Sequence, residues 1–169
     1  PYRPGDEAGI LELFNQAFGE DDPKYAECSL AHWRWEFLDN PAGTQVVLGV
    51  DGDGRVIGQY ACLPARVWLK DREVCCGQGI DSVVHQDYRR GLKREGAFLK
   101  IARYYYDHYG VPEVNAFGYG LPNKKAYHIG VRMLDYKPIA EPVLTVARNL
   151  FNFKDDDEVG RGGDGRGHI

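Results

Sequence analysis

The chain has 169 residues, a length that suits one globular domain. Its residues are 43% hydrophobic and 27% charged, which is close to the average for soluble globular proteins. The formal net charge of −4 argues against a general nucleic-acid-binding protein, and no apolar run approaches the roughly 18 residues of a membrane span.

The cysteines are Cys28, Cys62, Cys75 and Cys76. No pair has the Cys-x-x-Cys spacing of a redox or zinc motif, so we expect four reduced thiols, no metal ion and a cytoplasmic protein.

Two helices are predicted near the start of the chain. Apolar residues recur at helical spacing over residues 7–18, and Asp6 stands in front of them as a candidate N-cap. A second helix is predicted over residues 29–38, with Ser29 as its cap and the turn at 40–43 as its end.

The pattern then changes to an antiparallel meander of strands. Asp51-Gly52-Asp53-Gly54 is a strong hairpin turn, because Asp and Gly tolerate positive φ, and a second turn is expected at 70–72. Pro64 marks a bend or a sheet edge. The strands are expected over residues 45–50, 56–63, 65–69 and 73–85.

A long amphipathic helix follows. Gly110 stands where a helix C′ glycine is expected, and Pro112 follows it. Beyond it we expect a strand over 114–119, a short helix over 123–131, and a hairpin of 134–139 with 143–148. The apolar stripe of the long helix consists of Ala97, Phe98, Ile101, Ala102, Tyr105 and Tyr109.

This order of elements predicts an α/β fold with a mixed sheet and helices on both of its faces. Strands 73–85 and 114–119, joined by the long helix, should form a right-handed crossover with parallel strands. We expect one domain over residues 1–153 and a disordered acidic and Gly-rich tail over 154–169. The chain opens with Pro1, so residues 1–4 are expected to be the remnant of a truncated first strand.

The segment between strand 73–85 and the long helix carries the strongest chemical signal. A helix N-terminus offers backbone N–H groups and a partial positive charge, and pyrophosphate is its usual guest. The alternative is a basic loop whose cations face solvent or pair with Asp87 and Glu95. The cations are Arg89, Arg90, Lys93 and Arg94, and Gly91 and Gly96 would let a ligand approach the backbone.

This segment resembles motif A of the GNAT acyltransferases, in which Val-His-Pro-Asp-Tyr-Arg leads into a Gly-rich turn and a helix. The chain reads Val84-His85-Gln86-Asp87-Tyr88-Arg89. The resemblance covers about residues 2–148. It includes an Eis-like signature at Trp33-Arg34-Trp35-Glu36-Phe37 with Asn40-Pro41-Ala42-Gly43, the run Leu121-Pro122-Asn123 with Ala126-Tyr127, and Leu134-Asp135-Tyr136 where Leu-Gly-aromatic is usual.

The resemblance implies a GNAT fold, acetyl-CoA as cosubstrate, and direct transfer of the acetyl group to a primary amine in a ternary complex. It places Asp81 or His85 as the base and Tyr127, or else His128, as the acid that protonates the leaving thiolate. Asp81 would face the cleft if Val84 faces the other way. The cosubstrate would contact Val83, Val84, Arg89, Arg90, Gly91, Leu92, Lys93, Arg94, Glu95, Gly96, Asn123 and Ala126.

Two departures from the family pattern keep other functions open. Lys93 and Glu95 stand in the turn where small residues are usual, and Gly130 stands where many members have a Tyr. A degenerate CoA-binding or regulatory module, or one half of a larger two-domain transferase, therefore remains an alternative. The sequence does not identify the acceptor substrate. A homodimer is possible, and no nucleic-acid or membrane partner is expected.

Several candidate residues also have purely structural interpretations. Asp81 could bond a neighbouring strand, His85 could pack on Tyr88, and Tyr127 could pack on the sheet. Trp33 and Trp35 fit core packing better than an acceptor cleft.

Overall fold

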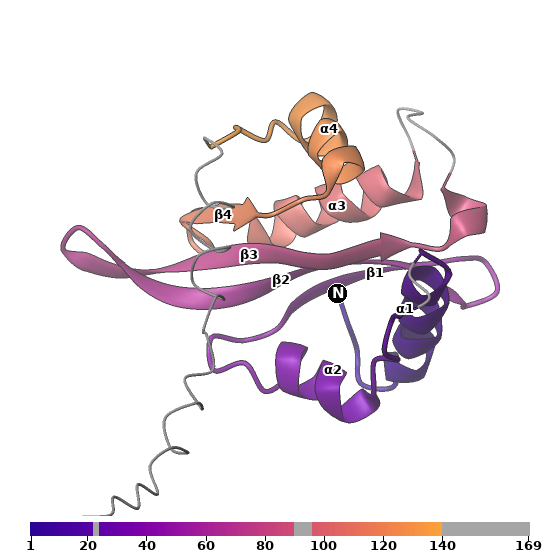
Figure 1. Ribbon diagram of the computed structural model, residues 1–169. Coiled ribbons are helices and arrows are strands. Elements are labelled where there is room, and N and C mark those ends of the chain that lie inside the picture. The colour runs from indigo at the N-terminus through magenta and orange to yellow at the C-terminus, as the bar shows by residue number, and fades with distance from the viewer. Residues whose placement is uncertain (22–23, 90–95, 140–169) are drawn as a thin grey trace, which may run out of the picture. The chain divides into compact units, whose positions relative to one another are not determined.

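The computed structural model describes residues 1–21, 24–89 and 96–139 (Figure 1). The chain divides into two units, Pro1–Tyr136 and Lys137–Ile169. Only residues 137–139 of the second unit are described, so the fold below is that of the first.

A four-stranded sheet in the order β1-β2-β3-β4 forms the centre of this unit. The first three strands are antiparallel neighbours, and β4 pairs with β3 in parallel, as the strand–helix–strand unit predicts. The mixed α/β sheet is therefore confirmed. The strands are β1 (Gln45–Val50), β2 (Val56–Leu69), β3 (Arg72–Val84) and β4 (Phe117–Gly120).

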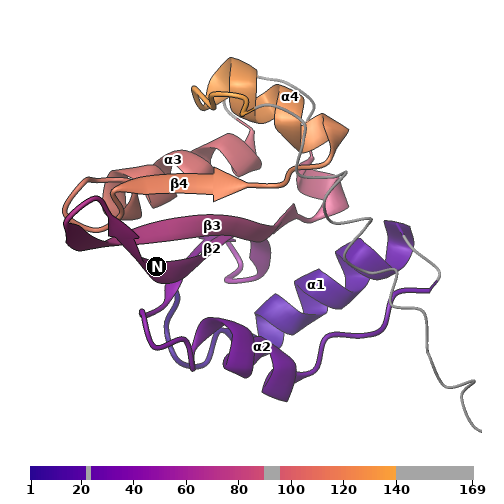
Figure 2. The same cartoon turned by 60° about the vertical axis from the view of Figure 1, so that its left-hand side comes forward.

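Helices cover both faces of the sheet (Figures 1 and 2). One face carries α1 (Glu7–Asp21) and α2 (Leu30–Phe37), and the other carries α3 (Ala97–Tyr109) and α4 (Lys124–Met133). A short 3-10 turn, Gln86–Tyr88, lies between β3 and α3. Within the described ranges, no helix is both long enough and apolar enough to cross a membrane.

Each face has its own hydrophobic core. On the α1–α2 face, Trp33 and Phe37 stand one helical turn apart and are both fully buried. The helix that presents them begins where Ser29 Oγ accepts a hydrogen bond from the His32 N–H at 3.1 Å, which confirms the predicted cap. On the α3 face, Ile101, Ala102 and Tyr105 pack against β1 and β2.

The C-terminus of α3 differs from the expectation. Gly110 caps the helix with φ of −83°, so its conformation is not left-handed. A Cβ at this position would lie 2.7 Å from Cδ1 of Tyr106 and 2.8 Å from its carbonyl oxygen. Glycine is therefore needed here for space rather than for a positive φ.

Two predicted strands, 56–63 and 65–69, are one strand. Pro64 lies opposite Gly77 within β2, and the register on either side of it is unbroken. Pairing between β1 and β2 ends at Cys62, so Pro64 lies where β2 has β3 as a neighbour and β1 no longer pairs. The predicted edge position is correct, because proline cannot donate to a second strand.

The last predicted strands are wrong in part. β4 begins only at Phe117, because Val114 and Asn115 each donate a backbone hydrogen bond to the Val111 carbonyl and form a turn. Residues 134–139 form no strand. Asp135 is left-handed with φ of 57°, and the Tyr136 N–H donates back to the Gly130 carbonyl at 3.1 Å. The other half of the expected hairpin, 143–148, lies outside the described residues.

Candidate functional site

A β-bulge interrupts β3 close to its end at Val84. Ala61 pairs with Ile80 and Gln59 pairs with Val83, so Asp81 and Ser82 together stand opposite Tyr60. Asp81 is left-handed with φ of 49°. Its carbonyl accepts a hydrogen bond from Gln59 Nε2 at 3.3 Å, which holds the bulge against β2. Such bulges re-aim a side chain, and here the carboxyl group lies on the α1–α2 face.

The Asp81 carboxyl lines a cavity of about 480 Å³ between β3, α1, α2 and the segment that joins the two helices. The apolar part of its wall includes Phe14, Phe18 and Tyr25, and its titratable groups include His32, Glu36 and Asp81. A cavity of this size holds a small organic molecule.

The two inner carboxyl groups of this cavity have perturbed acidity. Burial raises the pKa of Asp81 above its ordinary value, and His32 opposes the shift. Burial also raises the pKa of Glu36, the charge of Asp81 adds to this effect, and His32 again opposes it. The His32 Nε2 atom lies 3.8 Å from Glu36 Oε2. Raised carboxyl pKa values of this kind are typical of functional sites.

On its other side, the end of β3 is an open sheet edge. β4 pairs with residues 76–79 and ends at Gly120, so among the described residues no strand pairs with that side of residues 80–84. The His85 N–H donates to the Ile57 carbonyl at 2.9 Å. Because hydrogen-bonded positions alternate in an antiparallel ladder, the N–H and C=O of Val84 point away from β2 toward this open edge.

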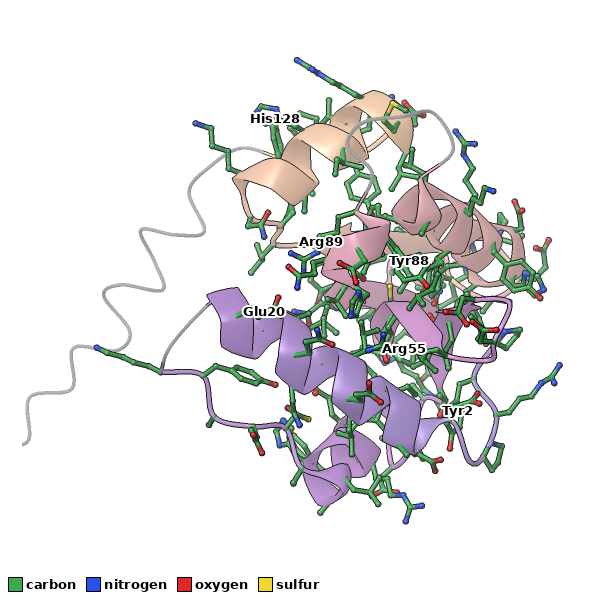
Figure 3. The ribbon with its side chains drawn as sticks, turned by 90° about the vertical axis from the view of Figure 1, so that its right-hand side faces the viewer. Tyr2, Glu20, Arg55, Tyr88, Arg89 and His128 are labelled. Carbon is green, nitrogen blue, oxygen red and sulfur yellow. The ribbon has the colours of Figure 1, made fainter. Side chains whose placement is uncertain are left out.

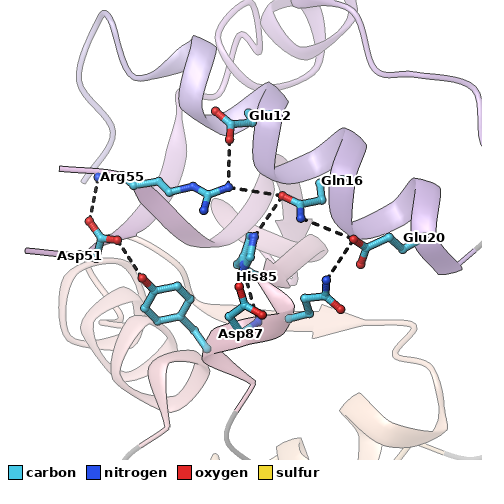
Figure 4. Close-up of polar contacts among 9 residues, drawn as sticks. Glu12, Gln16, Glu20, Asp51, Arg55, His85 and Asp87 are labelled. Atoms are coloured by element: carbon cyan, nitrogen blue, oxygen red, sulfur yellow. Dashed lines mark hydrogen bonds and ion pairs between the residues drawn. The ribbon is translucent and has the colours of Figure 1, made fainter. Parts of the chain in front are cut away.

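The turn after β3 is tied to α1 and to the β1–β2 hairpin. His85 is 3% exposed, and its Nε2 lies 3.0 Å from Gln16 Oε1 of α1 (Figure 4). Its Nδ1 accepts a hydrogen bond from the Asp87 N–H at 3.3 Å, so Nε2 carries the proton that Gln16 accepts. Tyr88 donates its hydroxyl to Asp51 Oδ2 at 2.8 Å, which fixes the turn to the β1–β2 hairpin.

The first cation of the basic segment also bonds to this edge. Arg89 Nε donates to the Val84 carbonyl at 2.7 Å, and Figure 3 shows Arg89 beside Tyr88 after the end of β3. At the other end of the segment, Gly96 is the N-cap of α3 and offers no side-chain cap, which leaves the helix N-terminus to a ligand or to the preceding loop. The residues between them, Arg90, Gly91, Leu92, Lys93, Arg94 and Glu95, lie outside the described residues.

The sequence of the chain matches a family model described as an acetyltransferase (GNAT) domain over residues 1–112. The chain belongs to the GNAT acetyltransferase family. The resemblance seen in motif A is thereby confirmed, and membership of the GNAT family implies an acyl-CoA cosubstrate.

Solved structures of acetyltransferases share the fold of this GNAT domain. An acetyltransferase from Trypanosoma brucei has a TM-score of 0.58 at 17% identity, covering 83% of this chain and 92% of its own. Glucosamine-6-phosphate N-acetyltransferase from Arabidopsis thaliana has a TM-score of 0.59 at 12% identity, and the match covers 83% of this chain and 91% of that enzyme. An aminoglycoside 6'-N-acetyltransferase from Acinetobacter haemolyticus has a TM-score of 0.56 at 15% identity, and the match covers 83% of this chain and 91% of that enzyme. At these identities the likeness shows the fold alone, and no curated protein matches the sequence.

Apart from Gly96 at the start of α3, the predicted site residues that the structure describes fall into two groups. Asp81, Val83, Val84 and Arg89 lie together around the bulge and the open edge. The residues predicted on α4 lie at that helix's own N-terminus, where the Asn123 side chain caps it by accepting the Ala126 N–H at 2.9 Å.

Tyr127, the predicted acid, is 38% exposed on α4, and its ring contacts that of its neighbour His128 at 5.6 Å. In the described part of the chain, no hydrogen bond, ion pair or ring contact joins Tyr127 to Asp81, Val83 or Val84. Tyr127 thus has no polar or ring contact with the described residues of the bulge.

Sequence reasoning missed the polar lining of the cavity. His32 and Glu36 stand four residues apart on α2, and Trp33 and Phe37 form the parallel buried pair. Both pairs have i,i+4 spacing, so each forms a row along one side of α2. This spacing could have predicted that the polar pair lies next to the buried pair. Trp33 is a core residue as expected, whereas Trp35 is 65% exposed, and neither lines the cavity.

Proposed function

We propose that this GNAT domain is an N-acetyltransferase that moves an acetyl group from acetyl-CoA to a primary amine by direct attack in a ternary complex. The observation that carries the proposal is the position of Asp81. Its carboxyl group lines the cavity, while the residues that follow it form the open edge of β3.

The described residues fit an acyl-CoA cosubstrate. Val84 directs its backbone N–H toward the open edge, where an amide-containing arm can pair with it as a further strand would. Gly96 begins α3 without a side-chain cap, which suits an anionic group at the helix N-terminus. Val83, Val84, Arg89 and Gly96 would hold the cosubstrate together with residues 90–95, and bound acetyl-CoA would supply the thioester.

Each step of the proposed transfer uses a group of this chain. Asp81 accepts a proton from the acceptor ammonium, and its raised pKa makes its carboxylate a stronger base than an ordinary one. The amine nitrogen then bonds to the acyl carbon as the carbon–sulfur bond breaks. The Val84 N–H donates to the carbonyl oxygen on which negative charge develops. Tyr127 is the proposed donor of a proton to the leaving thiolate, and the second proton that the attacking nitrogen loses as the amide forms restores the Tyr127 hydroxyl.

Calorimetric titration with acetyl-CoA and with free CoA is the first test. We expect micromolar binding that charge reversal at Arg89 weakens. With an amine panel, release of free thiol should then report turnover. Asp81→Asn should lower kcat by about 10²–10⁴-fold and leave the Kd for acetyl-CoA unchanged, because asparagine keeps the shape of the bulge but cannot accept the proton. Full turnover in both Asp81→Asn and Tyr127→Phe would refute these roles.

A specific observation favours a second candidate, a CoA-binding module without activity. Gly130 occupies the position where many GNAT members carry a Tyr as the acid, and a Cβ there would overlap the ring of Tyr136. This position therefore has no room for the usual acid. Binding of acetyl-CoA without turnover of any amine would support the second candidate.

A further inference from the structure

The wall of the cavity is apolar and held in place. Phe14 and Phe18 of α1 pack edge to face with ring centroids 5.1 Å apart, and Tyr25 packs on Phe18 at 5.9 Å. Asn15 fixes the segment that carries Tyr25. Its Oδ1 accepts the Tyr25 hydroxyl at 3.2 Å and the Cys28 N–H at 2.8 Å. The Tyr25 hydroxyl is thus used within the wall, and a bound molecule would meet mainly hydrocarbon here.

The opposite wall carries negative charge with little compensation. The His32 Nε2 atom lies 3.8 Å from Glu36 Oε2, near the limit of an ion pair, and it compensates the Glu36 charge only when His32 is protonated. Within the described ranges, Asp81 has no ion-pair partner. Glu27 adds a third carboxylate on an exposed stretch, where solvent screens it. A cation between Glu36 and Asp81 would compensate two partly buried charges at once.

We propose that the acceptor is a primary ammonium on a hydrophobic body. Glu36 and Asp81 hold the ammonium, and Phe14, Phe18 and Tyr25 cover the body. This inference rests on the proposed function, because Asp81 serves both, and it makes Glu36 a residue that determines specificity.

The chemistry of the wall separates this acceptor class from others. A sugar amine would bring hydroxyl groups against Phe14 and Phe18, where they would lose water without gaining partners. A diamine would place its second charge either against the same apolar wall or beside the exposed Glu27, where its interaction is screened. A hydrocarbon or aromatic body has neither cost and gains from burial.

A homologous series of amines tests the inference under saturating acetyl-CoA. Each buried methylene contributes about fourfold in affinity, so kcat/KM should rise by up to about 60-fold from propylamine to hexylamine, which differ by three methylenes. Hexylamine should also exceed glucosamine and 1,6-diaminohexane. A flat series, or a preference for glucosamine or for the diamine, overturns the inference while leaving the acetyltransferase function intact.

Variants of the wall and of the charged end give a second readout. Phe18→Leu should flatten the methylene series, and Glu36→Gln should raise KM for hexylamine at least tenfold while the Kd for acetyl-CoA stays the same. The matched controls are Phe117→Leu, on the exposed face of β4, and Glu73→Gln, beside the β2–β3 turn, and neither should change the series. Equal effects in variant and control overturn the inference.

Equilibrium binding separates this inference from the function on which it rests. If no amine is acetylated, the proposed function fails, and calorimetry with hexylamine alone still tests the cavity. Binding that Glu36→Gln abolishes and Glu73→Gln retains supports the acceptor class. No binding of hexylamine overturns it.

Discussion

At the scale of single residues, three non-glycine positions in the described part of the chain adopt positive φ: Lys70, Asp81 and Asp135. Asp135 stands where the family usually has glycine, and its left-handed conformation explains that usual choice. Asp81 forms the bulge beside the cavity, so its conformation belongs to the site. Lys70 lies in a hairpin turn between paired residues Leu69 and Arg72, where its conformation has no evident use.

We expect Lys70→Gly to raise the free energy of unfolding by about 0.5–1 kcal/mol, because glycine adopts a φ of 59° without the clash of a Cβ. Urea unfolding measures the change. Asp71→Gly, in the same turn but without a positive φ, should not stabilise the protein. A gain from Asp71→Gly as large as that from Lys70→Gly would contradict the conformational explanation.

Glu7 gives a prediction for acid stability. Hydrogen bonds from its own backbone N–H, the Tyr2 hydroxyl and the Gly5 N–H lower its pKa from 4.5 to about 2, and Arg34 adds to the shift. The folded state is therefore stabilised by the carboxylate above the ordinary pKa, and that contribution is lost as the pH falls from about 4.5 toward 2. Urea midpoints should fall more steeply across this window in wild type than in Glu7→Gln. Identical slopes would rule out this role.

At the scale of elements, one row of α1 side chains bonds to the β1–β2 hairpin and to the turn after β3. Glu12, Gln16 and Glu20 follow at i,i+4 spacing and bond to Arg55, His85 and Gln86 respectively (Figure 4). The same helix carries Phe14 and Phe18 on the cavity side. The wall of the cavity and the start of the basic segment are thus held by one helix.

Gln16→Ala should lower the free energy of unfolding by about 1–3 kcal/mol, because it leaves the buried His85 Nε2 without its acceptor. Gln86→Ala is the matched control. Its bond to Glu20 is exposed, so its effect should stay within about 0.5 kcal/mol. Thermal unfolding of both variants measures the difference, and a loss in Gln86→Ala that equals the loss in Gln16→Ala would argue against a special role for His85.

Three tyrosine hydroxyls connect the elements of the other face. Tyr106 lies 2.8 Å from both Tyr60 and Tyr136, and Tyr60 and Tyr136 also bond to each other. Burial raises the pKa of Tyr60 and of Tyr106, so both stay protonated hydroxyls at neutral pH. The cluster connects β2 and α3 to the turn that ends α4. These hydrogen bonds explain why the chain turns back toward the sheet after Met133.

The sequence predicts local features of this protein well. The bounds of α2, β1 and α3 follow from caps and periodicity, which depend on neighbouring residues. The bulge at Asp81 depends instead on the register between β2 and β3, and a single strand carries no record of that register. For the same reason the meeting of Glu36 with Asp81 was missed, since it needs α2 to pack beside the bulge.

At the scale of the whole molecule, the cavity carboxyl groups act on stability in the opposite sense to Glu7. Burial raises the pKa of Glu36 and of Asp81, so the folded state holds these protons more tightly than the unfolded state does. Stability from these groups is present below the ordinary carboxyl pKa and falls as the pH rises through the raised values.

We therefore expect Glu36→Gln and Asp81→Asn each to raise the melting temperature at pH 7.5 while lowering turnover. The gain should shrink as the pH falls toward the ordinary carboxyl pKa, because the two wild-type carboxyl groups then take up protons themselves. Glu73→Gln, on the exposed β2–β3 hairpin, should change neither quantity. A melting temperature that falls in both cavity variants at pH 7.5 would show that the carboxylates stabilise the fold.

The extra residue in β3 also sets the side of the sheet on which the carboxyl group lies. Without it, Asp81 would be the single partner of Tyr60, and alternation along the strand would carry its side chain to the α3 face, among the tyrosine hydroxyls. Deletion of Ser82 would keep Ile80, Val83 and Val84 opposite their present partners. Whether one or two residues separate Ile80 from Val83 thus decides which face of the sheet the Asp81 carboxyl group lies on. A change of one residue in length moves this charge from one core to the other and leaves the rest of the cavity lining as it is.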